Sequence, residues 1–240
     1  MVKAVFFDWF NTVAHYDPPR EELQSQVLQE FGINVSPQKL FRGILIADRN
    51  IYEENAEFPL RERSPEEQAK IYTRYQETVL TEAGVDVSGE PEMPLKTMKR
   101  MQQLSRGMRF VLFDDVLSTM KTLKERALIL GLLTNLDKDM RPLSREVGLE
   151  PYIDFTVTSG EVGVDKPKPL IFLAALEKAG VNASEAVHVG DQYKLDILGA
   201  RGVGITPILI DRYDSYPEVN DCPRIHSLTE VIQYLQLNPD

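Results

Sequence analysis

Apolar runs that each lead into a polar side chain limit the folds open to this chain more strongly than any other sequence feature. The runs lie at residues 3–7, 127–133 and 186–189, and the polar residues that follow them are Asp8, Thr134 and, after Gly190, Asp191. From about residue 110 onward such runs alternate with helical patterns, which indicates parallel strands in a doubly wound α/β sheet. Ligands of open α/β sheets bind beyond the carboxyl ends of the strands, so we expect these polar residues to share one site.

A long helical stretch separates the first strand from the others. Helical patterns begin at Pro18-Pro19, at Ser36-Pro37 and at Ser64-Pro65, and another covers roughly residues 92–105. Ser64-Pro65-Glu66-Glu67 has the form of a capping box with proline in the first turn. One short strand cannot stand alone, so residues 3–7 must join the later sheet, and the helical stretch is then an insertion. The sequence predicts an α/β core domain of residues 1–14 and 108–240 and a smaller all-helical domain of residues 15–107.

The charge balance narrows the classes of partner. The formal net charge of −10 argues against a nucleic acid or an anionic membrane bound by bulk electrostatics, although local cations or a metal ion can still hold an anionic small molecule. Cys222 is alone, so no intrachain disulfide can form, and we expect a cytoplasmic protein. The first strand begins at once without a signal-peptide pattern, and no uncharged apolar stretch is long enough to span a membrane.

Four short motifs occur in order along the chain. They are Asp8-Trp9-Phe10-Asn11-Thr12, Leu132-Leu133-Thr134-Asn135, Lys166-Pro167-Lys168-Pro169 and Gly190-Asp191 followed by Asp196. In order and spacing they resemble the haloacid dehalogenase-like (HAD) hydrolase superfamily, whose motifs are D-x-D-x-[T/V], a strand ending in Thr or Ser, a lysine often in K-P-x-P, and G-D-x(4)-D. The resemblance covers nearly the whole chain and implies a Rossmann-like core. The helical insertion matches the cap domain that one large branch carries just after the first motif.

The resemblance implies catalytic and substrate-binding roles for residues of the first three motifs. Asp8 is the expected nucleophile, which would form a covalent aspartyl intermediate. Thr134 offers its hydroxyl group to a phosphoryl oxygen, and Asn135 beside it is expected to contact the substrate. Lys166 supplies a positive charge that meets the transferred group and restrains the carboxylates.

The resemblance also implies a magnesium site. Asp8 and Asp191 form a pair of hard oxygen ligands suited to Mg²⁺. The backbone carbonyl group of Phe10 occupies the position of a further metal ligand. Asp196 either adds a water-mediated ligand, orients Lys166 or forms a structural salt bridge. By contrast, a histidine inside an apolar strand, such as His188, is expected in the core.

Phe10 departs from the phosphatase form of the first motif. In phosphatases that resemble this chain, the second aspartate of D-x-D is the general acid and base, whereas a phenylalanine can neither donate nor accept a proton. Loss of a positioned acid–base group costs roughly 10²–10⁴ in rate. Haloacid dehalogenases carry a tyrosine at this place but lack the G-D pair of which Asp191 is part. Phosphonoacetaldehyde hydrolases read D-W-A-G-T and need a cap lysine, and residues 43–69 contain none.

The sequence leaves three hypotheses for the function. The first is a Mg²⁺-dependent phosphatase-type hydrolase of a small phosphorylated metabolite, with proton transfer supplied by a group other than Phe10. The second is a metal-independent dehalogenase-like hydrolase that attacks carbon. The third is a binding protein with feeble catalysis that keeps the fold and the metal site. Substrate identity is left open, as is the choice between a monomer and a homodimer.

Overall fold

The chain divides into two compact units, each with its own hydrophobic core. A computed structural model describes residues 1–237, and its first unit joins Met1–His15 to the chain from Phe110 onward. The second unit comprises Tyr16–Arg109. The change of unit therefore falls within two residues of the domain limits expected at residues 14 and 108. No helix within residues 1–237 is long and apolar enough to cross a membrane.

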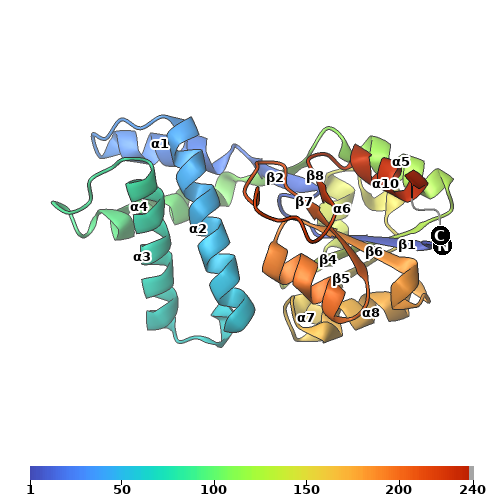
Figure 1. Ribbon diagram of the computed structural model, residues 1–240. Coiled ribbons are helices and arrows are strands. Elements are labelled where there is room, and N and C mark those ends of the chain that lie inside the picture. The colour runs from blue at the N-terminus through green and yellow to red at the C-terminus, as the bar shows by residue number, and fades with distance from the viewer. Residues whose placement is uncertain (238–240) are drawn as a thin grey trace. The chain divides into compact units, whose positions relative to one another are not determined.

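The first unit is built on a six-stranded sheet with the order β5-β4-β1-β6-β7-β8 (Figure 1). The strands are β1 (Ala4–Phe7), β4 (Ile129–Thr134), β5 (Phe155–Thr158), β6 (Ala186–Gly190), β7 (Thr206–Ile210) and β8 (Arg224–Ile225). Each neighbouring pair is parallel. The predicted doubly wound α/β core is confirmed. β1, which is far from its neighbours in sequence, lies between β4 and β6 at the centre of the sheet.

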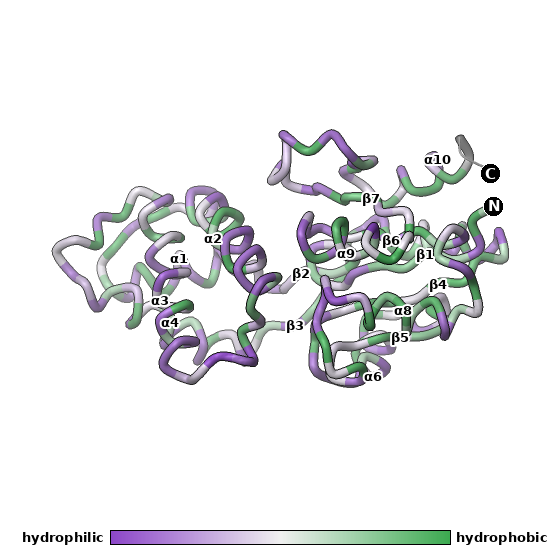
Figure 2. Tube along the Cα trace, turned by 60° about the horizontal axis from the view of Figure 1, so that its bottom comes forward, coloured by the Kyte–Doolittle hydropathy of each residue, from purple (hydrophilic) through white to green (hydrophobic). Residues whose placement is uncertain are grey.

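Side chains of β1 alternate between the two faces of the sheet. The helices that cover these faces are α5 (Val116–Glu125), α8 (Pro169–Ala179), α9 (Gly199–Gly202) and α10 (Thr229–Leu237). Val5 and Phe7 join a cluster with α5 and α10, whereas Ala4 and Phe6 join one with α8 and α9. Figure 1 shows α5 and α10 on one side of the sheet and α8 on the other. Burial on both faces explains why β1 reads as an unbroken apolar run, and β1 and β4 are largely hydrophobic in Figure 2.

Two short strands lie where the chain leaves the first unit and where it returns to it. β2 (Ala14–Asp17) and β3 (Arg109–Leu112) pair as a separate two-stranded sheet. Sequence reasoning misses both, because β2 carries histidine, tyrosine and aspartate in place of an apolar run. The segment predicted to be all-helical therefore begins with strand residues. The remaining elements of the first unit are α6 (Arg141–Glu146), α7 (Ser159–Val162), the 3₁₀ turns η3 (Glu150–Tyr152) and η4 (Ala183–Glu185), and the π-helical turn η5 (Tyr193–Leu198).

Helices make up most of the second unit. They are α1 (Arg20–Glu30), α2 (Pro37–Glu57), α3 (Pro65–Glu82) and α4 (Met93–Leu104), with the 3₁₀ turns η1 (Leu60–Glu62) and η2 (Ser105–Gly107). The predicted capping box is present at the start of α3, where the Ser64 hydroxyl accepts from the Glu67 N–H group at 3.3 Å and the Glu67 carboxylate accepts from the Ser64 N–H group at 2.9 Å. α2 and α3 approach closely at Gly43, where an added Cβ would lie 2.5 Å from the Val79 carbonyl oxygen, so this contact requires glycine.

Candidate active site

Asp8 stands at the carboxyl end of the central strand. Its N–H group donates to the Val189 carbonyl group of β6 at 2.9 Å, which continues the hydrogen bonding of β1 by one residue. The chain then turns back through Asn11, whose φ of 58° is one that asparagine adopts more readily than most residues, and the Asn11 N–H group donates to the Ala14 carbonyl at 2.8 Å. The Thr12 hydroxyl lies 3.5 Å from Oδ2 of Asp8. This tight turn holds the Asp8 side chain at the end of the sheet.

Lys166 lies at the centre of a buried ionic cluster. Its Nζ donates to Oδ1 of Asp8 at 2.5 Å, to Oδ1 of Asp196 at 2.6 Å and to the Leu133 carbonyl oxygen at 3.3 Å. The lysine side chain is only 2% exposed, so its ammonium group contacts protein oxygens instead of water. Burial alone would lower the pKa of Lys166, but the charges of Asp196 and Asp8 outweigh this effect and hold the pKa above its usual range. Lys166 is therefore a fixed positive charge beside Asp8.

Asn135 fixes the backbone that carries Lys166. Its Nδ2 donates to the Lys166 carbonyl oxygen at 3.2 Å, and the Lys166 N–H group donates to Oδ1 of Asn135 at 2.7 Å. This contact is one that the motif did not reveal, and the expected contact of Asn135 with substrate stays a prediction. Thr134 ends β4 and is 3% exposed, and its hydroxyl oxygen accepts from the Leu136 N–H group at 3.3 Å.

Asp196 is surrounded by hydrogen-bond donors. Besides Lys166, Nε2 of His188 lies 2.9 Å from Oδ1, and the Gln192 N–H group donates to Oδ2 at 3.0 Å. Burial would raise the pKa of Asp196, but the charge of Lys166 and the hydrogen bond from His188 bring the pKa below its usual range. His188 is buried, as expected, yet it also contacts the site. One sequence offers no signal that separates such a histidine from an ordinary core residue.

Asp191 completes a group of three carboxylates. One oxygen atom of each of Asp8, Asp191 and Asp196 lies within 4.8 Å of those of the other two. Burial and the charges of Asp8 and Asp196 raise the pKa of Asp191 well above its usual range, and burial raises the pKa of Asp8 to about 6. Crowded carboxylates of this kind are stabilised by a cation, and their hard oxygens suit a divalent metal ion. The donor set thus fits a metal site.

Phe10 packs into an aromatic group at the edge of the site. Its ring centroid lies 6.3 Å from that of Phe110, and the Trp9 ring lies 5.5 Å from the same phenylalanine. Lys138 Nζ lies 5.7 Å from the centroid of the Phe110 ring. The side chain of Phe10 is thus packed among aromatic rings at the border of the hydrophobic core. The role of the Phe10 carbonyl group as a metal ligand stays a prediction.

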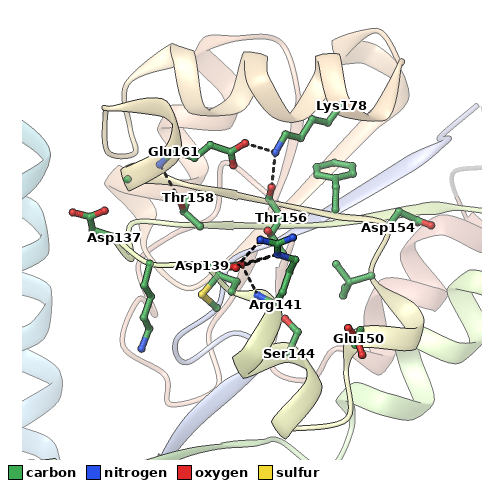
Figure 3. Close-up of a pocket in the computed structure, with 15 residues that line it drawn as sticks. Asp137, Asp139, Arg141, Ser144, Glu150, Asp154, Thr156, Thr158, Glu161 and Lys178 are labelled. Atoms are coloured by element: carbon green, nitrogen blue, oxygen red, sulfur yellow. Dashed lines mark hydrogen bonds and ion pairs between the residues drawn. The ribbon is translucent and has the colours of Figure 1, made fainter.

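A cavity of about 730 Å³ lies along β5, and none of the predicted site residues lines it (Figure 3). Figure 3 shows Lys178 directed at Glu161 and at the Thr156 carbonyl group, at 2.7 Å and 2.9 Å. Arg141 pairs with Asp139 across 2.8 Å. These charged groups of the cavity are bound to one another, so the cavity lacks the crowded carboxylates of the motif site.

Comparison with known proteins agrees with the motifs. A sequence model of the haloacid dehalogenase-like hydrolase family matches residues 2–204. The haloacid dehalogenase-like hydrolase domain-containing protein 3 of Danio rerio is 40% identical over 131 residues, which cover 53% of this chain and 54% of that protein. A phosphoserine phosphatase of Thermus thermophilus is 33% identical over 163 residues, which cover 65% of this chain and 64% of that protein. The chain thus spans about half the length of the first relative and 64% of the second.

A solved structure extends the likeness to both units of the chain. The 2-haloacid dehalogenase of Pseudomonas syringae superposes over 99% of both chains with a TM-score of 0.57 and 25% sequence identity. The fold, the carboxylate cluster around Lys166 and the match over residues 2–204 agree with one another. This chain belongs to the haloacid dehalogenase-like hydrolase family.

Proposed function

We propose that this hydrolase is a Mg²⁺-dependent phosphatase that acts on a small phosphorylated metabolite through Asp8. The observation that carries the proposal is the contact of Lys166 with both Asp8 and Asp196, beside the third carboxylate of Asp191. Three carboxylates would repel a phosphate group unless a cation neutralised them, so this cluster suits metal-assisted phosphoryl transfer. The similarity to a protein named phosphoserine phosphatase supports the same reaction class.

The residues around Asp8 define the first step. Lys166 holds Oδ1, which leaves Oδ2 as the oxygen that attacks phosphorus. As the bond from Oδ2 to phosphorus forms, the bond from phosphorus to the metabolite oxygen breaks, and that oxygen leaves with its electron pair. The Thr134 hydroxyl group is a donor for a phosphoryl oxygen, and the Lys166 ammonium group supplies positive charge beside the transferred group. Water then attacks the phosphorus of the aspartyl phosphate, which releases inorganic phosphate and restores Asp8.

Asp8 and Asp191 would hold the Mg²⁺ ion. When bound, the ion supplies neutralising charge for the phosphoryl oxygens. Asp196 contacts Lys166 at 2.6 Å and accepts a further hydrogen bond at each carboxylate oxygen. These contacts favour its role in orienting the lysine over a role as a direct metal ligand.

Phe10 sets a chemical preference among substrates. Without a general acid at this position, the metabolite oxygen must leave unprotonated or take its proton from water. Oxygens that leave easily as anions are therefore favoured, so acyl, enol or aryl phosphates are expected to react faster than simple alkyl phosphates. Rates across a series of aryl phosphates measure this preference as a steep dependence on the pKa of the leaving group.

A panel of phosphorylated compounds tests the proposal. Wild type and Asp8→Asn are assayed for phosphate release with Mg²⁺ and with excess EDTA, and the panel includes p-nitrophenyl phosphate and acetyl phosphate. We expect release that requires both the metal ion and Asp8. Release that persists unchanged in Asp8→Asn would rule out the Asp8 mechanism, and release that persists in EDTA would rule out the metal.

A dehalogenase-like hydrolase is the second candidate. The aromatic side chain of Phe10, packed on Phe110, is what favours it, because haloacid dehalogenases carry an aromatic residue there. In such a reaction Asp8 would attack carbon and halide would leave without need of a proton. Halide release from 2-haloacids in the presence of EDTA would support this function, and no release under any condition would end it.

A further inference from the structure

His188 is a fully buried polar side chain, and one side of its ring packs against an apolar helix. It lies in β6 on the face that packs against α8, its side chain is 0% exposed, and its ring meets the Phe172 ring edge-on with centroids 5.3 Å apart. Its Nδ1 atom is buried without a hydrogen-bond partner among the described residues. An unpaired buried polar atom destabilises the folded protein, and an apolar side chain at this position would avoid that cost. The histidine therefore calls for a reason beyond packing.

The other ring nitrogen supplies that reason. Nε2 lies 2.9 Å from Oδ1 of Asp196, and the same oxygen accepts from Nζ of Lys166 at 2.6 Å. An ionised carboxylate only accepts hydrogen bonds, so Nε2 carries the proton and Nδ1 is the bare nitrogen. Burial lowers the pKa of His188, although the hydrogen bond to Asp196 opposes this effect.

The donors around Asp196 come from three directions. The carboxylate torsion of an aspartate is broad, so a single donor does not fix its plane. Here Lys166 and His188 share one oxygen, and the Gln192 N–H group binds the other at 3.0 Å. The strand end closes the remaining side, because an added Cβ at Gly190 would lie only 2.2 Å from Cγ of Asp196. Removal of His188 would free one side of the oxygen that holds Lys166.

We propose that His188 is a positioning residue, whose Nε2–H group fixes the Asp196 carboxylate so that Asp196 holds the Lys166 ammonium group against Asp8. The chain of contacts runs from β6 to Asp196, then to Lys166, and ends at the nucleophile. The expected effect on turnover rests on the phosphatase function proposed above. The expected effect on Lys166 does not, because it concerns contacts within the protein alone.

Two variants separate this role from simple packing. His188→Leu removes the donor and keeps an apolar side chain, whereas His188→Gln can place an amide N–H group near the position of Nε2. Val187→Ala is the matched control, because Val187 is the buried neighbour on the same strand and faces the opposite cluster. Loss of its methyl groups lowers stability without contact with Asp196.

The first readout is the ammonium resonance of Lys166 in protein labelled with ¹⁵N-lysine. A buried ammonium group held by two carboxylates exchanges its protons slowly with water, and the signal is assigned by its absence in Lys166→Met. We expect this signal in wild type, in His188→Gln and in Val187→Ala, and its broadening or loss in His188→Leu. An unchanged signal in His188→Leu would overturn the proposal.

The second readout is steady-state turnover of p-nitrophenyl phosphate with saturating Mg²⁺. We expect His188→Leu to lower kcat by about 10- to 100-fold, with KM changed by less than roughly threefold, and His188→Gln to recover most of the loss. Equal kcat values for wild type and His188→Leu would overturn the role in turnover. If wild type hydrolyses no phosphorylated compound, the proposed function fails, and the lysine resonance alone then decides the positioning role.

Discussion

Both units of the chain bury charged side chains, but the ratio of carboxylates to cationic groups differs between the two buried sites. In the second unit, Arg20 forms two hydrogen bonds with the Asp48 carboxylate, at 3.0 Å and 2.5 Å, and the Tyr75 hydroxyl donates to the same carboxylate at 2.8 Å. The cation and the anion match one to one. In the first unit, among the residues that the structure describes, three carboxylates gather around the single ammonium group of Lys166.

This difference separates a structural ion pair from a site prepared for a ligand. The charges of Arg20 and Asp48 neutralise each other, so this pair needs no bound ion, and it joins α1 to α2. The cluster in the first unit keeps an excess of negative charge after Lys166 is counted. Burial raises the pKa of Asp8, and burial together with the charges of Asp8 and Asp196 raises the pKa of Asp191. A bound cation would remove the excess negative charge. An unbalanced buried cluster is therefore a stronger indication of function than burial of charge alone.

Asp8→Asn is expected to have the largest effect on activity. The amide of asparagine is a poor nucleophile and cannot form the aspartyl phosphate, so phosphate release should fall by about 10³-fold or more. Asp139→Asn is the matched control, because Asp139 is an exposed carboxylate that pairs with Arg141. Its activity should equal that of wild type. A similar loss in both variants would point to a general effect of reduced charge.

Removal of one carboxylate from the Arg20–Asp48 pair and of one from the carboxylate cluster around Lys166 should change the free energy of unfolding in opposite directions. Asp48→Asn leaves Arg20 without its counter-charge in a largely buried place, so the free energy of unfolding should fall by about 3 kcal/mol. Asp191→Asn relieves repulsion in the metal-free protein, so the free energy of unfolding should rise by about 1 kcal/mol. Urea unfolding in EDTA measures both. A fall of equal size in the two variants would contradict the distinction between the clusters.

Phe10→Asp should restore a general acid to the site. Hydrolysis of alkyl phosphates, whose oxygens need a proton, should rise by about 10²-fold, whereas p-nitrophenyl phosphate should gain much less. Parallel rate measurements on the two substrate classes check this. Phe10→Leu, which cannot transfer a proton, should leave the ratio of the two rates unchanged. An equal gain for both classes would show that Phe10 limits the rate through its size.

Affinity for Mg²⁺ should fall as the pH is lowered. The pKa of Asp8 is raised to about 6 by burial, and burial also raises the pKa of Asp191 well above its usual range, so protons compete with the metal ion for both carboxylates. At pH above the pKa of Asp8 this carboxylate is free to bind metal, and below about pH 6 the proton that the metal ion must displace from it should weaken binding by about tenfold per pH unit. Calorimetry at pH 7.5, 6.5 and 5.5 (about one unit apart) measures the slope. A flat profile would mean that these carboxylates are not the ligands.

The sequence predicts the core of the fold because its strands are apolar on both faces. β1, β4 and β6 appear as apolar runs, and the polar residue at the end of each run marks the carboxyl edge of the sheet. The sequence does not predict β2 and β3. Their pairing joins segments that are far apart in sequence, and β2 has no apolar run. A strand of that kind is specified by its partner.

The sequence predicts which residues belong to the candidate site, but it does not predict all the contacts that these residues make. The motifs single out Asp8, Lys166 and Asp196, and the structure brings these three side chains into direct hydrogen bonding. The second contact of Asp196, with His188, depends on which face of β6 meets α8 and on the turn that carries Asp196 back over the strand end. Register and turn geometry of this kind arise only from the folded chain.

A calorimetric titration of metal-free protein with Mg²⁺ decides whether the buried carboxylates around Lys166 bind a metal ion. Wild type, Asp191→Asn and the exposed control Asp139→Asn are compared at neutral pH in the same buffer. We expect one ion to bind per chain in wild type and in Asp139→Asn, and binding to be lost in Asp191→Asn. Absence of binding in wild type, or equal affinity in wild type and Asp191→Asn, would contradict the assignment of these carboxylates to a metal site.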